Sequence, residues 1–250
     1  MLILNTYIFL LGITLGSFYN VVGLRVPEGK SIVRPHSACP GCQHELTALE
    51  LVPVLSYMMQ GGKCKNCRSK ISPIYPIVEF LTGALFVLSF HVFGWSAETI
   101  VACTLVSLCI IITVSDLAYM IIPDKVLVVF LVLFVAERIW MPLAPWWDSA
   151  VGAVAGFGLL FIIALVSRGG MGGGDIKLYG VLGIVLGWKV TLLSFFLATL
   201  FGAIIGGVGM IGGKVKRGKP MPFGPFIVMG TLLAYFYGTR ILNWYWSFVL

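Results

Sequence analysis

The sequence predicts an all-α polytopic membrane protein with about eight transmembrane helices and one small loop that carries four cysteines. Hydrophobic residues make up 59% of the 250 residues and charged residues only 11%, and the mean hydropathy is +0.99. A soluble domain carries roughly 25% charged residues, so this chain has too few to cover a surface in water. The composition therefore excludes an ordinary soluble enzyme, a disordered chain and a small disulfide scaffold.

The transmembrane helices are predicted from apolar runs, because a helix needs about 20 mostly apolar residues to cross a bilayer. Six runs without charged residues have about this length: 1–24, 80–97, 99–115, 149–167, 190–213 and 220–239. Two shorter runs, at 126–136 and 178–188, extend to 121–141 and 176–188. Counting both gives eight spans.

The orientation is predicted from lysine and arginine, which prefer cytosolic loops. With the N-terminus outside, eight spans place all but three of the 17 basic residues inside, and the exceptions are Arg138, Lys189 and Arg240. Omitting either short span would move a basic loop outside. The net charge of +7 then needs no nucleic acid, and membrane lipids, anionic ones in particular, are the expected partners.

Three regions follow from this topology. The first is a transmembrane helix that runs from outside to inside, the second is a cytosolic subdomain, and the third is a membrane core with about seven helices. They cover residues 1–24, 25–73 and 74–250.

The loop at 25–73 contains two CxxC motifs, Cys39 with Cys42 and Cys64 with Cys67. Two such motifs at this spacing are typical of a zinc site in which four thiolates complete a tetrahedron. The alternatives are two disulfides or free thiols, and the cytosol disfavours disulfides. Because four cysteines leave no open coordination position, we expect a structural zinc ion that holds a subdomain too small to fold on a hydrophobic core alone.

Two aspartates lie at the inner ends of predicted spans, where ionisable groups are functional candidates. Asp116 ends one apolar helix, and Asp175 follows a glycine-rich stretch and opens another. Two carboxylates brought close together can share one proton and act as base and acid, which is the chemistry of aspartic proteases. Helix caps combined with an ion site would also explain the two residues. Asp148, beside Trp146 and Trp147, is expected to be solvated at the outer interface.

Several neighbours of the two aspartates are candidates for supporting roles. Gly172 and Gly174 allow the backbone to approach a substrate closely. Lys177 would balance the charge of Asp175 or anchor the helix at the interface, and Asp124 would cap the start of a helix. Glu79, near the start of another span, is either directed to the interface or part of a site.

Taken in order, several segments resemble the type IV prepilin peptidases, the bifunctional leader peptidases and N-methyltransferases. The N-terminal segments are Gly16–Val22 with Arg25–Pro27, the two CxxC motifs around Glu50–Tyr57, and Tyr75–Glu79. The C-terminal segments are Asp116 with Ile122–Asp124, Gly172–Lys177 of the GxGD type, and Pro222–Phe226. Each segment alone is a weak match, but the ordered set is specific and covers nearly the whole chain.

The resemblance implies that Asp116 and Asp175 form the catalytic pair of a GxGD aspartic peptidase, supported by Gly172, Gly174, Lys177 and Asp124. It implies that the four cysteines of the CxxC motifs bind zinc. It also implies a substrate or methyl-donor site among Glu79, Asn20, Arg25 and Glu50.

The implied reaction is removal of the leader from prepilin or pseudopilin precursors, including those of competence systems, at the cytosolic face of the bacterial cytoplasmic membrane. N-methylation of the new N-terminal residue with S-adenosylmethionine would follow. No glycine-rich nucleotide-binding fingerprint accompanies this second activity, so its prediction depends on the resemblance alone.

Two other functions compete with this one. A GxGD protease that cuts a different membrane anchor would use the same chemistry. A cation-coupled transporter would use Asp116 and Asp175 as ion ligands, but it would need broken helices at the bilayer midplane and internal symmetry. No internal repeat is visible in the sequence, and both aspartates lie near one membrane face.

Overall fold

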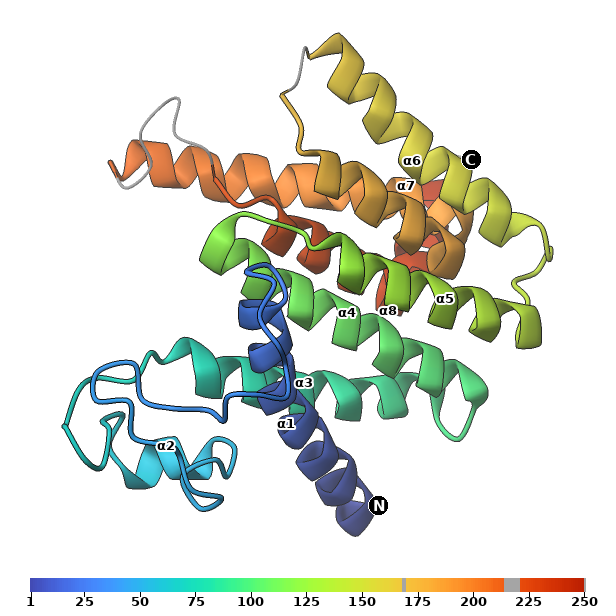
Figure 1. Cartoon of the computed structure of the whole chain (residues 1–250). Helices are drawn as coiled ribbons and strands as arrows, with labels where there is room; N and C mark the ends of the chain where they lie inside the picture. Colours follow the sequence, from blue (N-terminus) through green and yellow to red (C-terminus); the bar gives the residue numbers. More distant parts are fainter. Residues whose placement is uncertain (168–169, 214–220, 250) are drawn as a thin grey trace. The chain divides into compact units, whose positions relative to one another are not determined.

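A computed structural model describes residues 1–167, 170–213 and 221–249, which form helices joined by loops and no strand longer than an isolated bridge (Figure 1). The predicted basic loop at 214–219 and Arg168 lie outside these residues. The chain divides into two compact units, Met1–Val114 and Ser115–Leu250. The helices are α1 (Leu2–Arg25), α2 (Leu55–Met59), α3 (Ile74–Phe93), α4 (Ala97–Tyr119), α5 (Asp124–Trp140), α6 (Asp148–Val166), α7 (Gly173–Ile211) and α8 (Gly224–Val249).

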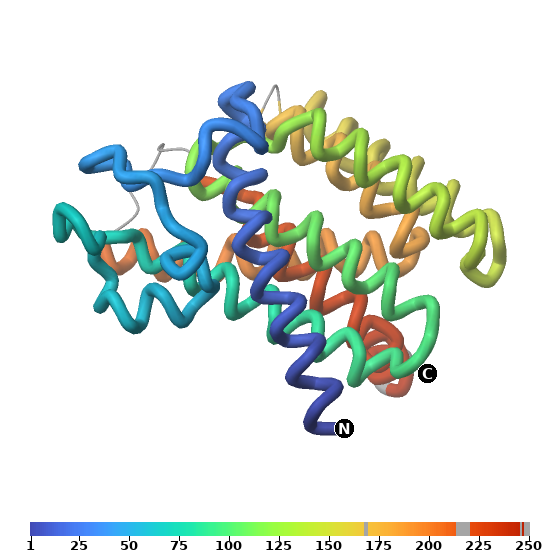
Figure 2. The backbone as a smooth tube through the Cα atoms, turned by 60° about the horizontal axis from the view of Figure 1, so that its bottom comes forward, coloured from blue at the N-terminus to red at the C-terminus, as the bar shows by residue number. Residues whose placement is uncertain are grey.

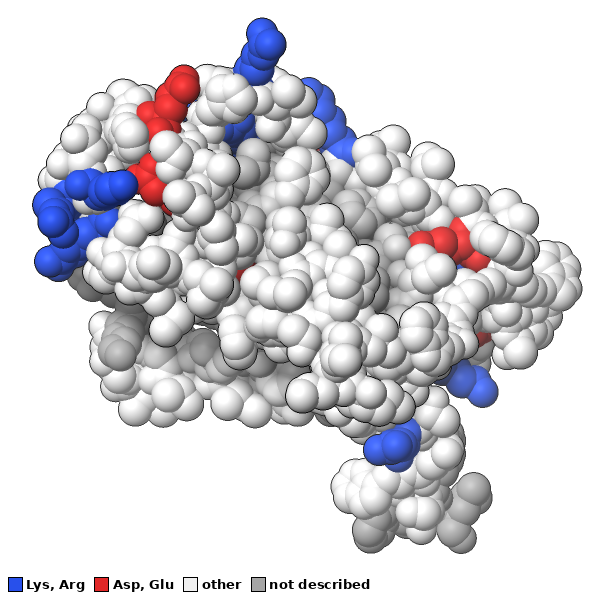
Figure 3. All heavy atoms as spheres, turned by 90° about the horizontal axis from the view of Figure 1, so that it is seen from below, with Lys and Arg blue, Asp and Glu red and all other residues white. Residues whose placement is uncertain are grey.

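Six helices in the described part of the chain are long and apolar enough to cross a membrane: α1, α3, α4, α6, α7 and α8. The 17-residue helix α5 is slightly shorter than a full span. On the face drawn in Figure 3, uncharged residues cover most of the surface, as expected where lipid replaces water. The prediction of an all-helical, multi-pass membrane protein is confirmed.

In the first unit, α1 and α3 pack against each other at glycines. A Cβ atom placed on Gly12 would lie 2.7 Å from Cα of Gly83, and one on Gly16 would lie 2.9 Å from Cα of Glu79. The spacing of Gly12 and Gly16 is the small-residue pattern that lets membrane helices approach closely. Tyr19 of α1 also shares a buried 2.7 Å hydrogen bond with Ser107 of α4.

In the second unit, α7 is a helical hairpin rather than one straight helix. Gly187 has φ 71° and ψ 169°, which interrupts the helix. The rings of Tyr179 and Phe195 meet with centroids 5.8 Å apart, and the hydroxyl oxygens of Tyr179 and Ser194 lie 3.5 Å apart. In a continuous helix, residues 15 or 16 positions apart would be separated by about 23 Å. The two arms, 173–186 and 188–211, therefore run antiparallel (Figure 1), and they agree with the predicted spans 176–188 and 190–213.

The first arm of α7 packs against α6, and the second arm contacts α8 (Figures 1 and 2). A Cβ atom on Gly152 would lie 2.8 Å from the backbone of Gly187. One on Gly230 of α8 would lie 2.6 Å from the backbone nitrogen of Ala198. Glycines thus let the backbones of this unit approach closely, and they help to place the residues at the helix ends.

Candidate active site

Asp116 lies in the last turn of α4 and is only 5% exposed. The hydroxyl of Ser115, which is fully buried, donates a hydrogen bond to the carbonyl of Ile121. Met120, at φ 55°, ends the helix in the left-handed conformation. These features fold the 120–123 turn back against the end of α4, so that α5 begins beside Asp116.

The Asp116 carboxylate accepts a hydrogen bond from the backbone N–H of Gly224, with an N···Oδ2 distance of 2.7 Å. Gly224 is the first residue of α8, and the first N–H groups of a helix have no partner within it. The carboxylate therefore lies at the positive end of the α8 dipole, which favours a negative charge. Pro222–Phe226 is one of the segments that carry the family resemblance, but nothing in its sequence indicated that Gly224 would bind Asp116.

Asp175 lies in the first turn of α7, after the extended residue Gly172. Its carboxylate lies against the backbone of Gly172, and it is near enough to Asp116 for the two negative charges to repel each other. The side chain of Asp175 is partly buried. The two aspartates that the sequence selected thus approach each other. Asp175 lies in the first turn of α7, and the carboxylate of Asp116 contacts the first residue of α8.

Two contacts join the start of α7 to the 120–125 segment. A Cβ atom on Gly174 would lie 2.9 Å from Cβ of Ile122, so only glycine allows this approach. The Lys177 ammonium lies 2.9 and 2.7 Å from the two carboxylate oxygens of Asp124. The ammonium of Lys177 therefore pairs with Asp124, which is the first residue of α5 and follows the N-cap residue Pro123. Both side chains are more than half exposed.

The four predicted metal ligands, Cys39, Cys42, Cys64 and Cys67, come together with all sulfur atoms within 4.8 Å of one another. The Sγ–Sγ distances are 3.7 Å for Cys39–Cys67 and 4.0 Å for Cys42–Cys64. A tetrahedral ion with bonds of about 2.3 Å to sulfur requires sulfur atoms about 3.8 Å apart. The cluster therefore has the dimensions of a four-thiolate metal site.

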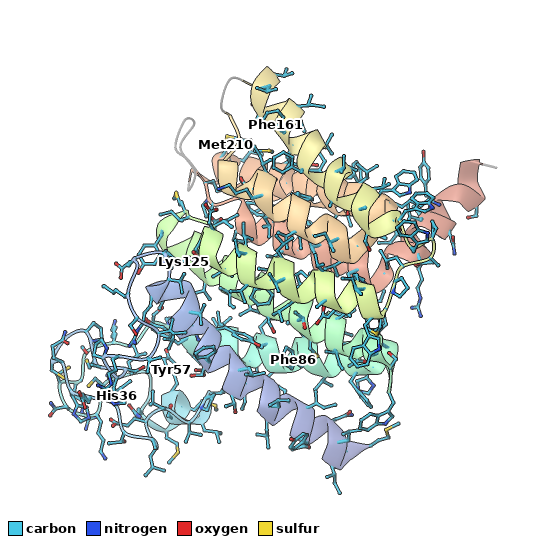
Figure 4. All side chains as sticks on the ribbon, turned by 45° about the vertical axis from the view of Figure 1, so that its right-hand side comes forward. His36, Tyr57, Phe86, Lys125, Phe161 and Met210 are labelled. Atoms are coloured by element: carbon cyan, nitrogen blue, oxygen red, sulfur yellow. The ribbon has the colours of Figure 1, made fainter. Side chains whose placement is uncertain are left out.

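The surroundings of the cluster favour the thiolate at two of its four cysteines, Cys39 and Cys67, whereas the pKa of Cys42 is raised to about 11. Hydrogen bonds from the Ser69 hydroxyl and from the backbone amides of Cys42 and Gly41 lower the pKa of Cys39 to about 6. The Ser69 hydroxyl and amide also lower the pKa of Cys67. Metal ions bind the deprotonated thiol, so Ser69 supports metal binding. His36 lies in this loop but outside the cluster (Figure 4).

Two of the four residues expected in a substrate or methyl-donor site are used to hold the loop together. Arg25 donates hydrogen bonds to the carbonyls of Ser31 and Pro35, at 3.1 and 2.8 Å. Glu50 accepts hydrogen bonds from the amide and hydroxyl of Thr47, and these lower the pKa of its carboxyl group. The second carboxylate oxygen of Glu50, Oε1, is buried without a hydrogen-bond partner.

The other two, Asn20 and Glu79, lie where α1 crosses α3. Glu79 is 8% exposed, and its Oε2 accepts the N–H of Val54 at 2.7 Å. Val54 has φ 61°, which is unusual for a β-branched residue. Asn20 donates to the carbonyl of Tyr75 at 3.2 Å, while its Oδ1 atom is buried without a hydrogen-bond partner. A buried acceptor of this kind needs a donor from water or a ligand.

Comparisons with known proteins identify two matching family models. Residues 10–93 match the bacterial peptidase A24 N-terminal domain, and residues 103–207 match the type IV leader peptidase family. No solved structure gives a significant match.

Three curated relatives are each named prepilin leader peptidase/N-methyltransferase. The protein from Bacillus subtilis (strain 168) is 43% identical over 95% of this chain and 96% of its own length. Those from Aeromonas salmonicida (strain A449) and Pseudomonas aeruginosa are 33% and 32% identical, over 97% and 96% of this chain and 94% and 92% of their own lengths. The chain belongs to the type IV leader peptidase family.

Proposed function

We propose that this chain is an intramembrane aspartic endopeptidase of the bacterial cytoplasmic membrane. It removes the leader from prepilin or pseudopilin precursors and methylates the new N-terminal residue. The main support is the convergence of Asp116 and Asp175 at the starts of α8 and α7. The names of the relatives support both the substrate and the second activity.

Asp116 and Asp175 share the work of an acid and a base. Two carboxylates that repel each other hold one proton between them, so one is ionised while the other is protonated. The ionised carboxylate takes a proton from a water molecule, and that water attacks the scissile carbonyl. The protonated carboxylic acid donates its proton to the carbonyl oxygen. When the tetrahedral intermediate collapses, the carboxyl group that took the proton from water passes it to the leaving amine, and the other carboxylate recovers its proton from the hydroxyl group. The two groups titrate as a pair.

The residues around the pair position it. The N–H of Gly224 holds one oxygen of Asp116. Gly172 leaves room for the carboxylate of Asp175, and Gly174 leaves room for Ile122. The pair of Lys177 and Asp124 fixes the first arm of α7 to the start of α5. The peptide bond is cut at the cytosolic face if the N-terminus lies outside, as the distribution of basic residues favours.

Zinc is the metal that best suits four thiolates at these distances. Cys39, Cys42, Cys64 and Cys67 would hold it with no coordination position left for water. The ion, when bound, cross-links the loop. We therefore assign it a structural role and assign the hydrolysis to the aspartates alone.

The methyl-transfer site is proposed at Asn20 and Glu79. Their buried oxygens are acceptors that suit an ammonium group, and the Oδ1 atom of Asn20 has no partner. Both S-adenosylmethionine and a newly cleaved peptide carry such a group. S-adenosylmethionine supplies the methyl group when bound, while Glu79 and Asn20 orient an amine.

Asp116→Asn and Asp175→Asn provide the test. Each variant should fold, keep its thermal midpoint and cleave a purified prepilin at least about 10³-fold more slowly. Each should still methylate a substrate supplied without its leader, which separates loss of the dyad from loss of the fold. Normal cleavage by either variant would refute the assignment.

A further inference from the structure

The turn of the α7 hairpin at Gly187 exposes backbone groups that a continuous helix would have paired. Only glycine readily adopts φ 71° with ψ 169°. The first arm, 173–186, is about 20 Å long, which is less than the hydrocarbon thickness of about 30 Å. At least one of its ends therefore lies within the hydrocarbon region. Backbone groups there must find partners inside the protein.

Arg138 supplies one partner from the last turn of α5. It is 6% exposed, and its Nη2 donates to the carbonyl oxygen of Val185 at 2.7 Å. In a continuous helix this carbonyl would accept the N–H of residue 189, four positions later. The turn removes that bond, and the guanidinium replaces it.

Asp148 supplies the partner on the other side of the turn. It is the first residue of α6, and its Oδ1 accepts the N–H of Trp188 at 3.3 Å. The same carboxylate fills the position that a Cβ atom on Gly187 would take. The hydroxyl of Thr191 completes the set by donating to the carbonyl of Gly187 at 2.6 Å.

The signs of the two charges match the two helix ends. The guanidinium of Arg138 lies at the C-terminal, negative end of the first arm, and the carboxylate of Asp148 lies at the N-terminal, positive end of the second. Charged residues on membrane helices are costly and seldom serve packing alone. Here two charged residues, Arg138 of α5 and Asp148 of α6, both bind backbone groups of the short turn at Gly187.

The turn lies at the opposite end of the first arm from Asp175. Twelve residues separate Gly187 from Asp175, a distance of about 18 Å along the helix. A tilt of about 5° at the turn would move the Asp175 carboxylate by about 1.5 Å, and a misplacement of about 1 Å can cost about 100-fold in rate. The position of the turn therefore controls the distance between Asp175 and Asp116.

We propose that Arg138 and Asp148 are positioning residues for peptide cleavage, which hold the Gly187 turn and thereby place Asp175 against Asp116. This inference rests on the proposed catalytic role of Asp175. The two residues touch neither the substrate nor the reacting atoms. They act through the first arm of α7.

Kinetics of Arg138→Met and Asp148→Ala test the proposal. Each variant should lower kcat for prepilin cleavage about 10- to 100-fold while KM stays within about twofold. Arg138→Lys and Asp148→Asn, which retain a donor and an acceptor, should recover most of kcat. Arg240→Met is the matched control, because Arg240 is an exposed arginine of α8, and it should leave kcat unchanged. An unchanged kcat in both Arg138→Met and Asp148→Ala would overturn the proposal.

A cross-linking measurement reports the position of the arm directly. Asp124→Cys and Lys177→Cys replace the exposed ion pair that joins α5 to the catalytic end of the first arm. A short bismaleimide should link them efficiently, and Arg138→Met or Asp148→Ala should reduce the yield several-fold. A fall in kcat with an unchanged yield would overturn the proposal, because the arm would not have moved. Should Asp175→Asn still cleave, the catalytic assignment fails, while the yield still reports whether the turn positions the arm.

Discussion

The backbone nitrogen of Gly224 lies 2.7 Å from Oδ2 of Asp116, which joins the end of α4 to the start of α8. A Cβ atom on Gly224 would lie 2.7 Å from this oxygen and 2.9 Å from the Cβ atom of Asp116. Both distances are shorter than side chains tolerate. Any residue larger than glycine must therefore push the Asp116 carboxylate away from the helix end.

We expect Gly224→Ala to lower kcat for prepilin cleavage at least about tenfold, since it displaces one member of the catalytic pair by roughly 1 Å. Gly207→Ala in α7 is the control, because nothing lies within 4 Å of the position of its Cβ atom. Both variants should be assayed with one purified precursor at saturating concentration. Equal rates for the two would show that the contact with Gly224 does not position Asp116.

Adjacent glycines before Asp175 should respond differently to the same change. A Cβ atom on Gly174 would lie 2.9 Å from Cβ of Ile122, whereas one on Gly173 would meet nothing within 4 Å. Gly174→Ala should therefore reduce cleavage about tenfold or more by moving Asp175 away from the 120–123 turn. Gly173→Ala should be tolerated. If Gly173→Ala is as damaging as Gly174→Ala, flexibility of the whole stretch matters more than this contact.

Metal removal should affect the cysteine loop, residues 26–73, before it affects the membrane helices. A subdomain that folds around its ion loses structure when the ion is removed. Treatment with a strong chelator, or Cys64→Ser, should speed proteolysis between residues 26 and 73 by about tenfold or more. The α-helical circular dichroism should change little.

Elemental analysis of the untreated protein should give about one zinc per chain. Ser69→Ala, which removes the hydroxyl near Cys39 and Cys67, should weaken zinc retention in a competition with a chelator without abolishing it. Equal proteolysis with and without chelator would contradict a structural role for the ion.

The sequence predicted the features that depend on local pattern. Apolar length and the asymmetry of basic residues predicted two short spans, which the structure shows as α5 and the first arm of α7. The CxxC spacing predicted the four-sulfur cluster. Asp116 and Asp175 were selected because charges are rare in apolar helices, and that reasoning needs no knowledge of how the helices pack.

Contacts between distant segments were not predictable in the same way. Gly224 and Asp116 are 108 residues apart in the sequence but form a hydrogen bond. No periodicity in the sequence indicates that these two residues are in contact. Lys177 was expected either to balance the charge of Asp175 or to anchor the helix at the interface, but its ammonium pairs with Asp124. Asp148 was expected to be only a solvated residue, yet it accepts the N–H of Trp188. In each case the partner is set by how helices pack, which one sequence does not reveal.

Close packing of α6 on the first arm of α7 should make Gly152 intolerant of side chains. A Cβ atom at this position would lie 2.8 Å from the backbone of Gly187, and backbone cannot move aside as a flexible side chain can. Gly152→Ala should therefore lower the free energy of unfolding by about 1–3 kcal/mol through overpacking. Gly158→Ala in the same helix is the control, because nothing lies within 4 Å of its Cβ position and alanine favours the helix. Thermal unfolding in one detergent should show a lower midpoint for Gly152→Ala and an equal or higher one for Gly158→Ala. Equal midpoints for Gly152→Ala and the unmodified protein would mean that α6 can move away from α7 at little cost.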